Sequence, residues 1–213
     1  MSTIRHQLIG LLVVVMSGLA AAQRAPSPSP QAILDRAIDD FEGGRFAESV
    51  AGFDQLITVV PAYKPQLWQR GIALYYAGRF DDCRAQFELH RTVNPDDVEN
   101  AAWHFLCVAR AASPEKARAA LLPVGPDSRV PMRQVYQMFR GSLSPEEVLS
   151  AAGGSPAARF YAELYVGLYA EALGRKEVAL EHIRAAAADR FASAGGYMHM
   201  VARVHLASLR RKP

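Results

Sequence analysis

Residues 67–95 read LWQRGIALYYAGRFDDCRAQFELHRTVNP and decide the fold of this chain. Their apolar residues recur with helical spacing on both sides of Gly78, which predicts two short helices joined by a tight turn. Part of the pattern also occurs 34 residues upstream, so that residue 44 corresponds to residue 78. The recurring residues are Gly44-Arg45-Phe46 with Gly78-Arg79-Phe80, Phe53 with Phe87, and Pro61 with Pro95. This shared offset predicts an array of helical hairpins.

A few small and large residues explain why such a hairpin forms and stacks. Gly71 and Cys83 are small, and we expect the two helices to cross closely there. Phe87 is large enough to fill the wedge between this hairpin and the next. Gly78 supplies the open backbone conformation that a short helix–helix turn requires. Pro61 ends the corresponding helix of the upstream copy, because its ring clashes with the preceding turn.

The rest of the chain extends the hairpin pattern into an all-α fold. Apolar residues at helical spacing, glycine turns and proline ends divide it into about four units. The units cover residues 30–63, 64–97, 98–122 and 160–193, and the third is degenerate. Residues 127–155 are interpreted as an insertion with a capping box at Ser144-Pro145-Glu146-Glu147. Residues 195–211 are expected to form a C-terminal capping helix. The expected domain is therefore an α-solenoid over residues 31–211.

The N-terminus has the layout of a secretory signal peptide over residues 1–22. Its features are a basic start at Arg5, an apolar run over 8–20 and a cleavage site at Ala20-Ala21-Ala22. The stretch QRAPSPSP, 23–30, is expected to be an extended Pro/Ser linker. We therefore expect an exported protein, periplasmic or extracellular. The alternatives are an uncleaved segment that anchors the chain in a membrane, and a transit peptide, although the stretch is not Arg- and Ser-rich.

Cys83 and Cys107 are the two cysteines of the chain. They fall on helices of neighbouring units that should pack together, so a disulfide is geometrically possible in an oxidising compartment. The alternative is two buried thiols that act as small hydrophobic side chains. The spacing is not CxxC, and the sequence therefore indicates neither a metal site nor redox catalysis.

Composition and motifs argue against several classes of function. The chain has 24 basic and 21 acidic residues, a net charge of +3 and a pI near 9.0. It lacks the basic stripe that is typical of nucleic-acid binding. Arg129 and Arg133 are interpreted as solvated, and Asp96-Asp97 as acids that offset a helix dipole. No GxSxG, HExxH or P-loop motif occurs. We therefore expect no catalysis, no cofactor, no metal site and no nucleic-acid partner.

The 34-residue period and the 67–95 stretch resemble the tetratricopeptide repeat (TPR) family. The pattern W-x2-L-G-x2-Y…A-x3-F…P is met literally at Gly71, Phe87 and Pro95. The departures are Leu67, Arg70, Leu74 and Cys83, of which Arg70 is the most unusual. The runs RGIALYYAGR and FYAELYVGLYAEALGR are similar to NlpI-like bacterial envelope TPR proteins. Arrays of that group dock cell-wall hydrolases and proteases, so the resemblance implies an adaptor for other proteins.

The resemblance also identifies candidate contact residues, because the first helix of each TPR unit lines a concave groove. The candidates are Trp68, Gln69, Ile72, Tyr75, Tyr76, Trp103, Tyr161 and Tyr165. Aromatic side chains dominate binding hot spots because they combine a large buried area with polar groups. We expect an extended peptide or a helix of another protein there. The alternative is that these residues are core, or that the 127–155 insertion or the C-terminal helix fills the groove.

Two functions fit these expectations. The first is a non-catalytic binding or scaffold module, which holds a peptide or protein segment in the concave groove. The second is a self-associating structural protein, in which the aromatic face is core or a homodimer interface. The two differ in whether the aromatic face is free to bind another protein.

Overall fold

The computed structural model describes residues 28–211, and every regular element in that range is a helix. The all-α prediction is therefore confirmed for this part of the chain. The expected signal peptide, 1–22, and most of the linker, 23–30, lie outside the described residues. No helix between residues 28 and 211 is long and apolar enough to cross a membrane.

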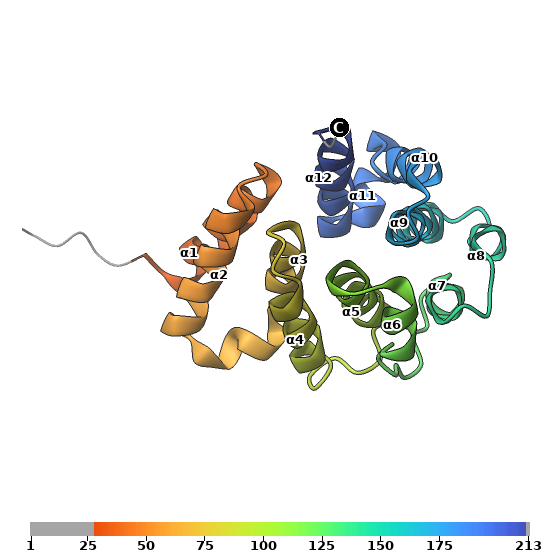
Figure 1. The fold of residues 1–213 in the computed structure, drawn as a ribbon. Coiled ribbons are helices and arrows are strands. Elements are labelled where there is room, and N and C mark those ends of the chain that lie inside the picture. The colour runs from red at the N-terminus through yellow and green to blue at the C-terminus, as the bar shows by residue number, and fades with distance from the viewer. Residues whose placement is uncertain (1–27, 212–213) are drawn as a thin grey trace, which may run out of the picture.

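Short loops join most of the helices, the longest connection being residues 120–131, and most helices adjacent in sequence pack as neighbours (Figure 1). The α-helices are α1 (Pro30–Glu42), α2 (Phe46–Val59), α3 (Trp68–Tyr76), α4 (Phe80–His90), α5 (Val98–Ala111), α6 (Pro114–Ala119), α7 (Met132–Arg140), α8 (Pro145–Ala151), α9 (Pro156–Ala172), α10 (Lys176–Ala186), α11 (Ala192–Gly195) and α12 (Tyr197–Arg211). Two 3-10 segments are η1 (Pro61–Gln66) and η2 (Asp189–Phe191). The helices pack in pairs as α1–α2, α3–α4, α5–α6 and α9–α10, while α7 and α8 lie in the expected insertion.

Three of these helix pairs are joined by the same kind of turn. Gly44, Gly78 and Gly174 have a left-handed backbone, with φ of 73°, 75° and 74°. The residue after each glycine is an arginine, namely Arg45, Arg79 and Arg175. A side chain disfavours this backbone conformation, so each glycine fixes where its pair reverses direction. The predicted role of Gly78 is confirmed.

Gly71 allows α3 and α4 to approach each other closely. A Cβ atom at this position would lie 2.7 Å from the ring of Phe87, closer than real side chains approach. Phe87 also stacks on Trp103 of α5, with ring centroids 6.4 Å apart. It therefore packs within its own pair and against the next, as predicted. Gly167 and Ile183 repeat the arrangement in α9 and α10, where the corresponding distance is 2.8 Å.

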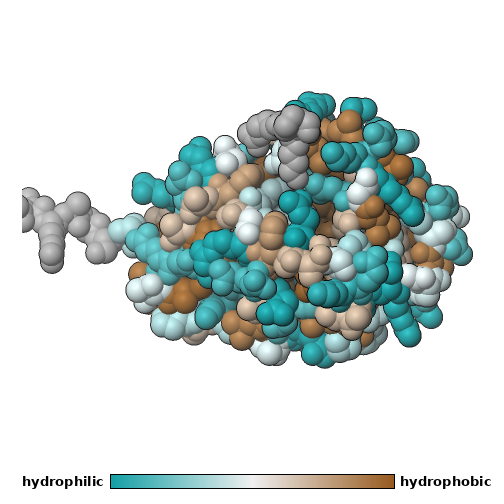
Figure 2. Space-filling view, in the orientation of Figure 1, coloured by the Kyte–Doolittle hydropathy of each residue, from teal (hydrophilic) through white to brown (hydrophobic). Residues whose placement is uncertain are grey.

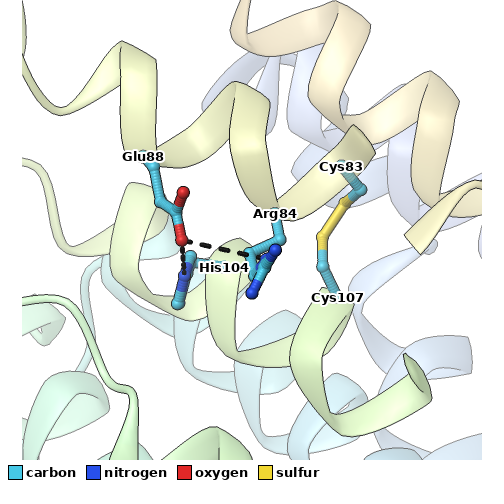
Figure 3. The surroundings of a disulfide bond; sticks show 5 residues. All are labelled: Cys83, Arg84, Glu88, His104 and Cys107. Carbon is cyan, nitrogen blue, oxygen red and sulfur yellow. Dashed lines mark hydrogen bonds and ion pairs between the residues drawn. A yellow bond between two sulfur atoms is a disulfide. The ribbon is translucent and has the colours of Figure 1, made fainter. Parts of the chain in front are cut away.

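A disulfide between Cys83 and Cys107 joins α4 to α5 (Figure 3). The two Cα atoms are 5.9 Å apart, and both residues are fully buried. Of the two alternatives left by the sequence, the structure contains the bridge. Beside it, Glu88 of α4 lies 3.4 Å from His104 of α5, so a polar contact accompanies the covalent one (Figure 3).

Arg70 departs from the repeat pattern, and two hydrogen bonds explain why. Its Nε donates to Asp54 of α2 at 2.7 Å, and its Nη1 donates to Gln86 of α4 at 2.9 Å. The Arg70 side chain is 12% exposed, so water competes little for its hydrogen bonds. A cation at this position joins three consecutive helices, which an aliphatic residue cannot do.

The expected insertion, 127–155, contains two ordered helices. Ser144 Oγ accepts a hydrogen bond from the Glu147 amide at 3.2 Å, and Glu147 Oε2 accepts one from the Ser144 amide at 2.8 Å. This reciprocal pair is the predicted capping box at the start of α8. Both helices pack on α9, and α7 also packs on α5.

α12 forms at the expected C-terminal position and joins distant parts of the chain. It packs on α10, as a capping helix would, and it also contacts α1. Figure 1 shows α12 beside α9 and α10, on the side toward α3. The first and last helices of the described range therefore meet.

One core of large apolar side chains extends through the helix pairs. Its fully buried phenylalanines are Phe41, Phe53, Phe87, Phe105, Phe139 and Phe160. Large hydrophobic side chains exposed in the described range are scattered, at Val59, Tyr63, Val93, Val130 and Val178. On the face shown in Figure 2, apolar residues reach the surface in small areas separated by polar ones.

Candidate binding site

α12 lies against several of the predicted groove residues. Tyr197, its first residue, contacts Trp68 of α3 with ring centroids 4.9 Å apart. Farther along α12, a hydrogen bond of 2.8 Å joins His205 Nδ1 to the Tyr76 hydroxyl. His205 Nε2 also lies 3.0 Å from Glu171 Oε2 of α9. The C-terminal helix therefore covers part of the inner face, by which we mean the surface of α1, α3 and α9 toward α12.

The eight candidate residues divide by burial. Four are buried, with exposed fractions of 0% for Ile72 and Tyr165, 1% for Trp103 and 6% for Tyr75. Four are half-buried, namely Trp68, Gln69, Tyr76 and Tyr161. The second group is therefore accessible at the surface. The first group packs in the core of the helix pairs, and one of its members, Trp103, also borders a pocket.

Three of the candidates come together in one pocket of about 300 Å³. Trp68, Trp103 and Tyr161 line it from α3, α5 and α9, and Tyr197 closes it from α12. Its polar lining includes Asp97, Glu99 and Arg129. We call this site the tryptophan pocket, because it contains both tryptophans of the chain. Its volume is at the lower end of the range for ligand sites, which suits a single side chain or a short segment.

The start of α5 brings two carboxylates and an indole to the tryptophan pocket. Asp97 is the N-cap residue, and its side chain accepts a hydrogen bond from the Glu99 amide at 2.9 Å. Acids are favoured there because a helix N-terminus carries partial positive charge. Glu99 and Trp103 are four residues apart, so they lie on the same side of the helix. α5 therefore places negative charge next to an aromatic ring.

Arg129 connects these acids to the loop before α7. Its guanidinium donates to Glu99 and Asp127 at 2.6 Å each, and it also pairs with Asp97. Its Cζ atom lies 5.8 Å from the ring centroid of Tyr161, within cation–π distance. Arg129 is exposed, as interpreted from the sequence, and its guanidinium also makes three ion pairs while the side chain stays 40% exposed.

Burial raises the pKa of several groups around the pocket. It raises the pKa of Glu99, and the negative charge of Asp97 raises it further. The Tyr165 hydroxyl, which donates to Glu99 Oε2 at 2.6 Å, and the charge of Arg129 partly oppose this rise. Burial also raises the pKa of Tyr161 to about 12 and that of Tyr165 well above its ordinary range. Tyr165 therefore keeps the proton that it donates to Glu99.

Two polar atoms of the residues that line the pocket lack a hydrogen bond within residues 28–211. They are the indole Nε1 of Trp103 and the hydroxyl of Tyr197, and both are shielded from solvent. Buried polar groups are nearly always paired, because an unpaired one costs about 1–3 kcal/mol. A ligand that reaches these two atoms would therefore supply the hydrogen bonds that they lack.

Nine residues that line the pocket are not among the candidates from the sequence, and they include Asp97, Glu99, Arg129 and Tyr197. The sequence interpretation already gives Asp97 a role as an acid at the start of a helix. Arg129 lies outside the repeats, so the repeat pattern does not predict its position. A signal for Glu99 exists, since an acid four residues before a tryptophan shares its helix face. Tyr197 reaches the pocket because α12 folds back, which local periodicity does not encode.

A second pocket of about 300 Å³ lies along the C-terminal half of α12. Tyr75, Tyr76, Arg110 and His205 contribute to its lining. The guanidinium of Arg110 lies 5.2 Å from the ring centroid of Phe80, so this cation already has an aromatic partner. α12 thus separates two sites on the inner face, and the hydrogen bond between His205 and Tyr76 belongs to the second.

No family model matches this sequence. In the part of the chain that the structure describes, no group of His, Cys, Asp and Glu side chains is arranged to hold a metal ion. The tryptophan pocket instead combines aromatic faces, carboxylates and unpaired polar atoms. These features suit recognition of a side chain together with its backbone.

Proposed function

We propose that this chain is a TPR-like solenoid that acts as a non-catalytic binding or scaffold module of the cell envelope. Its binding site is the tryptophan pocket, which holds a segment of another protein. The observation that carries the proposal is that both tryptophans of the chain line one pocket beside α12. Tryptophan and tyrosine are the residues most enriched at binding hot spots, together with arginine.

The repeated local geometry supports the solenoid part of the proposal. Gly44 and Gly78 have the same left-handed turn 34 residues apart, which is the TPR period. Helix pairs packed in series present their first helices on a common face, where such arrays bind partners. Three of the rings that line the tryptophan pocket, those of Trp68, Trp103 and Tyr161, come from α3, α5 and α9, each the first helix of a pair.

The disulfide supports the export part of the proposal. Disulfides persist in oxidising compartments and are rare where thiols are kept reduced. The bridge between Cys83 and Cys107 fits a periplasmic or extracellular location. The expected signal peptide, 1–22, would deliver the domain there, and the Pro/Ser linker would follow the cleavage site.

Selection from a peptide library tests the proposal. Random linear peptides are displayed, selected on the immobilised chain, resynthesised and titrated. We expect Trp68→Ala to weaken binding about thirtyfold, because losing a hot-spot side chain costs about 2 kcal/mol. Tyr63→Ala is the matched control, since it removes an exposed aromatic residue of η1 that does not line the pocket. It should leave binding unchanged.

Further measurements separate binding from folding and from self-association. Trp68→Phe keeps an aromatic ring and should retain most of the affinity, and thermal melting shows whether Trp68→Ala is folded. Failure to enrich any peptide, or equal binding by Trp68→Ala and the unaltered chain, contradicts the proposal. A sedimentation coefficient that rises with concentration would favour the alternative, a self-associating structural protein.

A further inference from the structure

We propose that the tryptophan pocket recognises an arginine or lysine side chain within an extended segment of the partner. This inference rests on the proposed function and states the chemistry that the partner must carry. Three features of the pocket support it: an excess of carboxylates, several aromatic rings and the two unpaired polar atoms.

Carboxylates outnumber guanidinium groups at the pocket. Asp97 and Glu99 line it, and Asp127 holds the same guanidinium that they contact. Three carboxylates share Arg129, so two negative charges remain when all three are ionised. A cation that enters is therefore attracted, and an anion is repelled.

The contacts of Arg129 indicate how the pocket would hold a second cation. Carboxylates pair with the edge of its guanidinium, and the ring of Tyr161 lies 5.8 Å from Cζ. Trp68 and Tyr197 offer further rings, which meet at an interplanar angle of 81°. Tryptophan gives the strongest cation–π contacts, and arginine forms them more often than lysine. A side chain of the partner would thus lie between these rings and the carboxylates.

The unpaired atoms favour a peptide over a small cation. Trp103 Nε1 is a donor only, so its partner must be an acceptor such as a backbone carbonyl. Metal ions and polyamines carry no such acceptor. Because Nε1 and the Tyr197 hydroxyl are shielded from solvent, we expect the first turn of α12 to shift when a segment enters. Gly196 directly precedes this turn, with φ of 51°, and gives the backbone freedom to do so.

Tryptophan fluorescence of the full chain reads the pocket directly, because Trp68 and Trp103 are its two tryptophans. The probes are two short, acetylated and amidated peptides without tryptophan or tyrosine. They differ at one residue, which is arginine in one and citrulline, its neutral isostere, in the other. We expect a saturable change with the arginine peptide and about tenfold weaker binding of the citrulline peptide, since a charged hydrogen-bond partner is lost.

Charge-neutral variants test the carboxylates. Glu99→Gln and Asp97→Asn each remove one charge with little change in shape, and asparagine still caps a helix. Each should weaken binding of the arginine peptide about tenfold and leave the affinity for the citrulline peptide nearly unchanged. Asp81→Asn is the matched control, because Asp81 is an exposed acid at the start of α4 that does not line the pocket. If Glu99→Gln does not fold, Asp97→Asn decides the test.

Several outcomes would overturn the inference. They are equal affinity for the two probe peptides, no response to either, or no effect of the two carboxylate variants. The library selection keeps this failure distinct from failure of the proposed function. Enriched peptides that lack basic residues but depend on Trp68 for binding would support the proposed binding module. They would contradict recognition of an arginine or lysine side chain in the pocket. Enriched peptides with a shared arginine or lysine support both.

Discussion

At the scale of single residues, small side chains set how closely the helices approach. Gly71 faces Phe87 across α3 and α4, and Gly167 faces Ile183 across α9 and α10. We expect Gly71→Ala to lower the free energy of unfolding by about 1–3 kcal/mol, because the new methyl group overpacks a closed contact. Urea unfolding followed by circular dichroism measures this change.

Gly154→Ala is the control for that prediction. Gly154 is exposed, its backbone is not left-handed, and a Cβ atom there would meet nothing within 4 Å. Alanine at such a site is neutral or stabilises by up to about 1 kcal/mol, since it restricts the unfolded chain. Equal effects of the two substitutions would show that α3 and α4 do not touch at Gly71.

Glu99 gives a pH-dependent prediction at the same scale. Burial raises its pKa above the ordinary value of 4.5, so the folded chain keeps a proton that the unfolded chain has lost. The stabilisation linked to that proton is complete below the ordinary pKa and is lost as pH rises through the raised one. The stability of the unaltered chain should therefore fall relative to Glu99→Gln across this window.

Urea unfolding of both proteins at a series of pH values measures the difference. The other groups that face Glu99, namely Asp97, Arg129, Tyr161 and Tyr165, are present in both proteins, so much of their own titration cancels. A difference in the free energy of unfolding that stays constant with pH, or that changes in the opposite direction, would contradict the prediction. It would show that Glu99 ionises as freely in the folded chain as in the unfolded one.

At the scale of elements, the disulfide joins α4 of one pair to α5 of the next. It closes a loop with a sequence separation of 24 residues, for which loop-closure entropy predicts about 3 kcal/mol of stabilisation. We expect reduction, or replacement of both cysteines by alanine, to lower the free energy of unfolding by about this amount. Free thiols detected in the unreduced chain, or unchanged stability after reduction, would contradict the bridge.

The helices themselves could be predicted where local chemistry specifies them. Gly78 fixes a turn because a left-handed backbone favours glycine, and Ser144 with Glu147 forms a capping box that four consecutive residues encode. The course of α12 could not be predicted in this way. Its apolar face fits α10, but contact with α1 and with Trp68 depends on the curvature that all the preceding pairs produce.

The candidate site could be predicted only in part. The phase of the repeats assigns Trp68, Trp103 and Tyr161 to the groove side of their helices, and these three residues share one pocket. Ile72 and Tyr165 follow from the same phase but are fully buried, because periodicity does not distinguish a groove wall from a core. Arg129 comes from a loop outside the repeats, so only the folded chain brings it to Glu99.

At the scale of the whole molecule, the helix pairs create an inner face, and α12 covers part of it. Trp68, Trp103 and Tyr161 come from three helix pairs and Tyr197 comes from α12, so the pocket exists only when these elements are assembled. A binding partner should therefore stabilise the domain as a unit. The proposed binding module therefore requires the assembled array and not one helix pair alone.

The most direct test of binding in the tryptophan pocket is the tryptophan emission of the full chain during titration with a selected peptide that lacks tryptophan. We predict a saturable change in emission, with a midpoint that matches the Kd from calorimetry, because Trp68 and Trp103 both line the pocket. Tight binding by calorimetry with unchanged emission would place the peptide elsewhere and contradict binding in the tryptophan pocket.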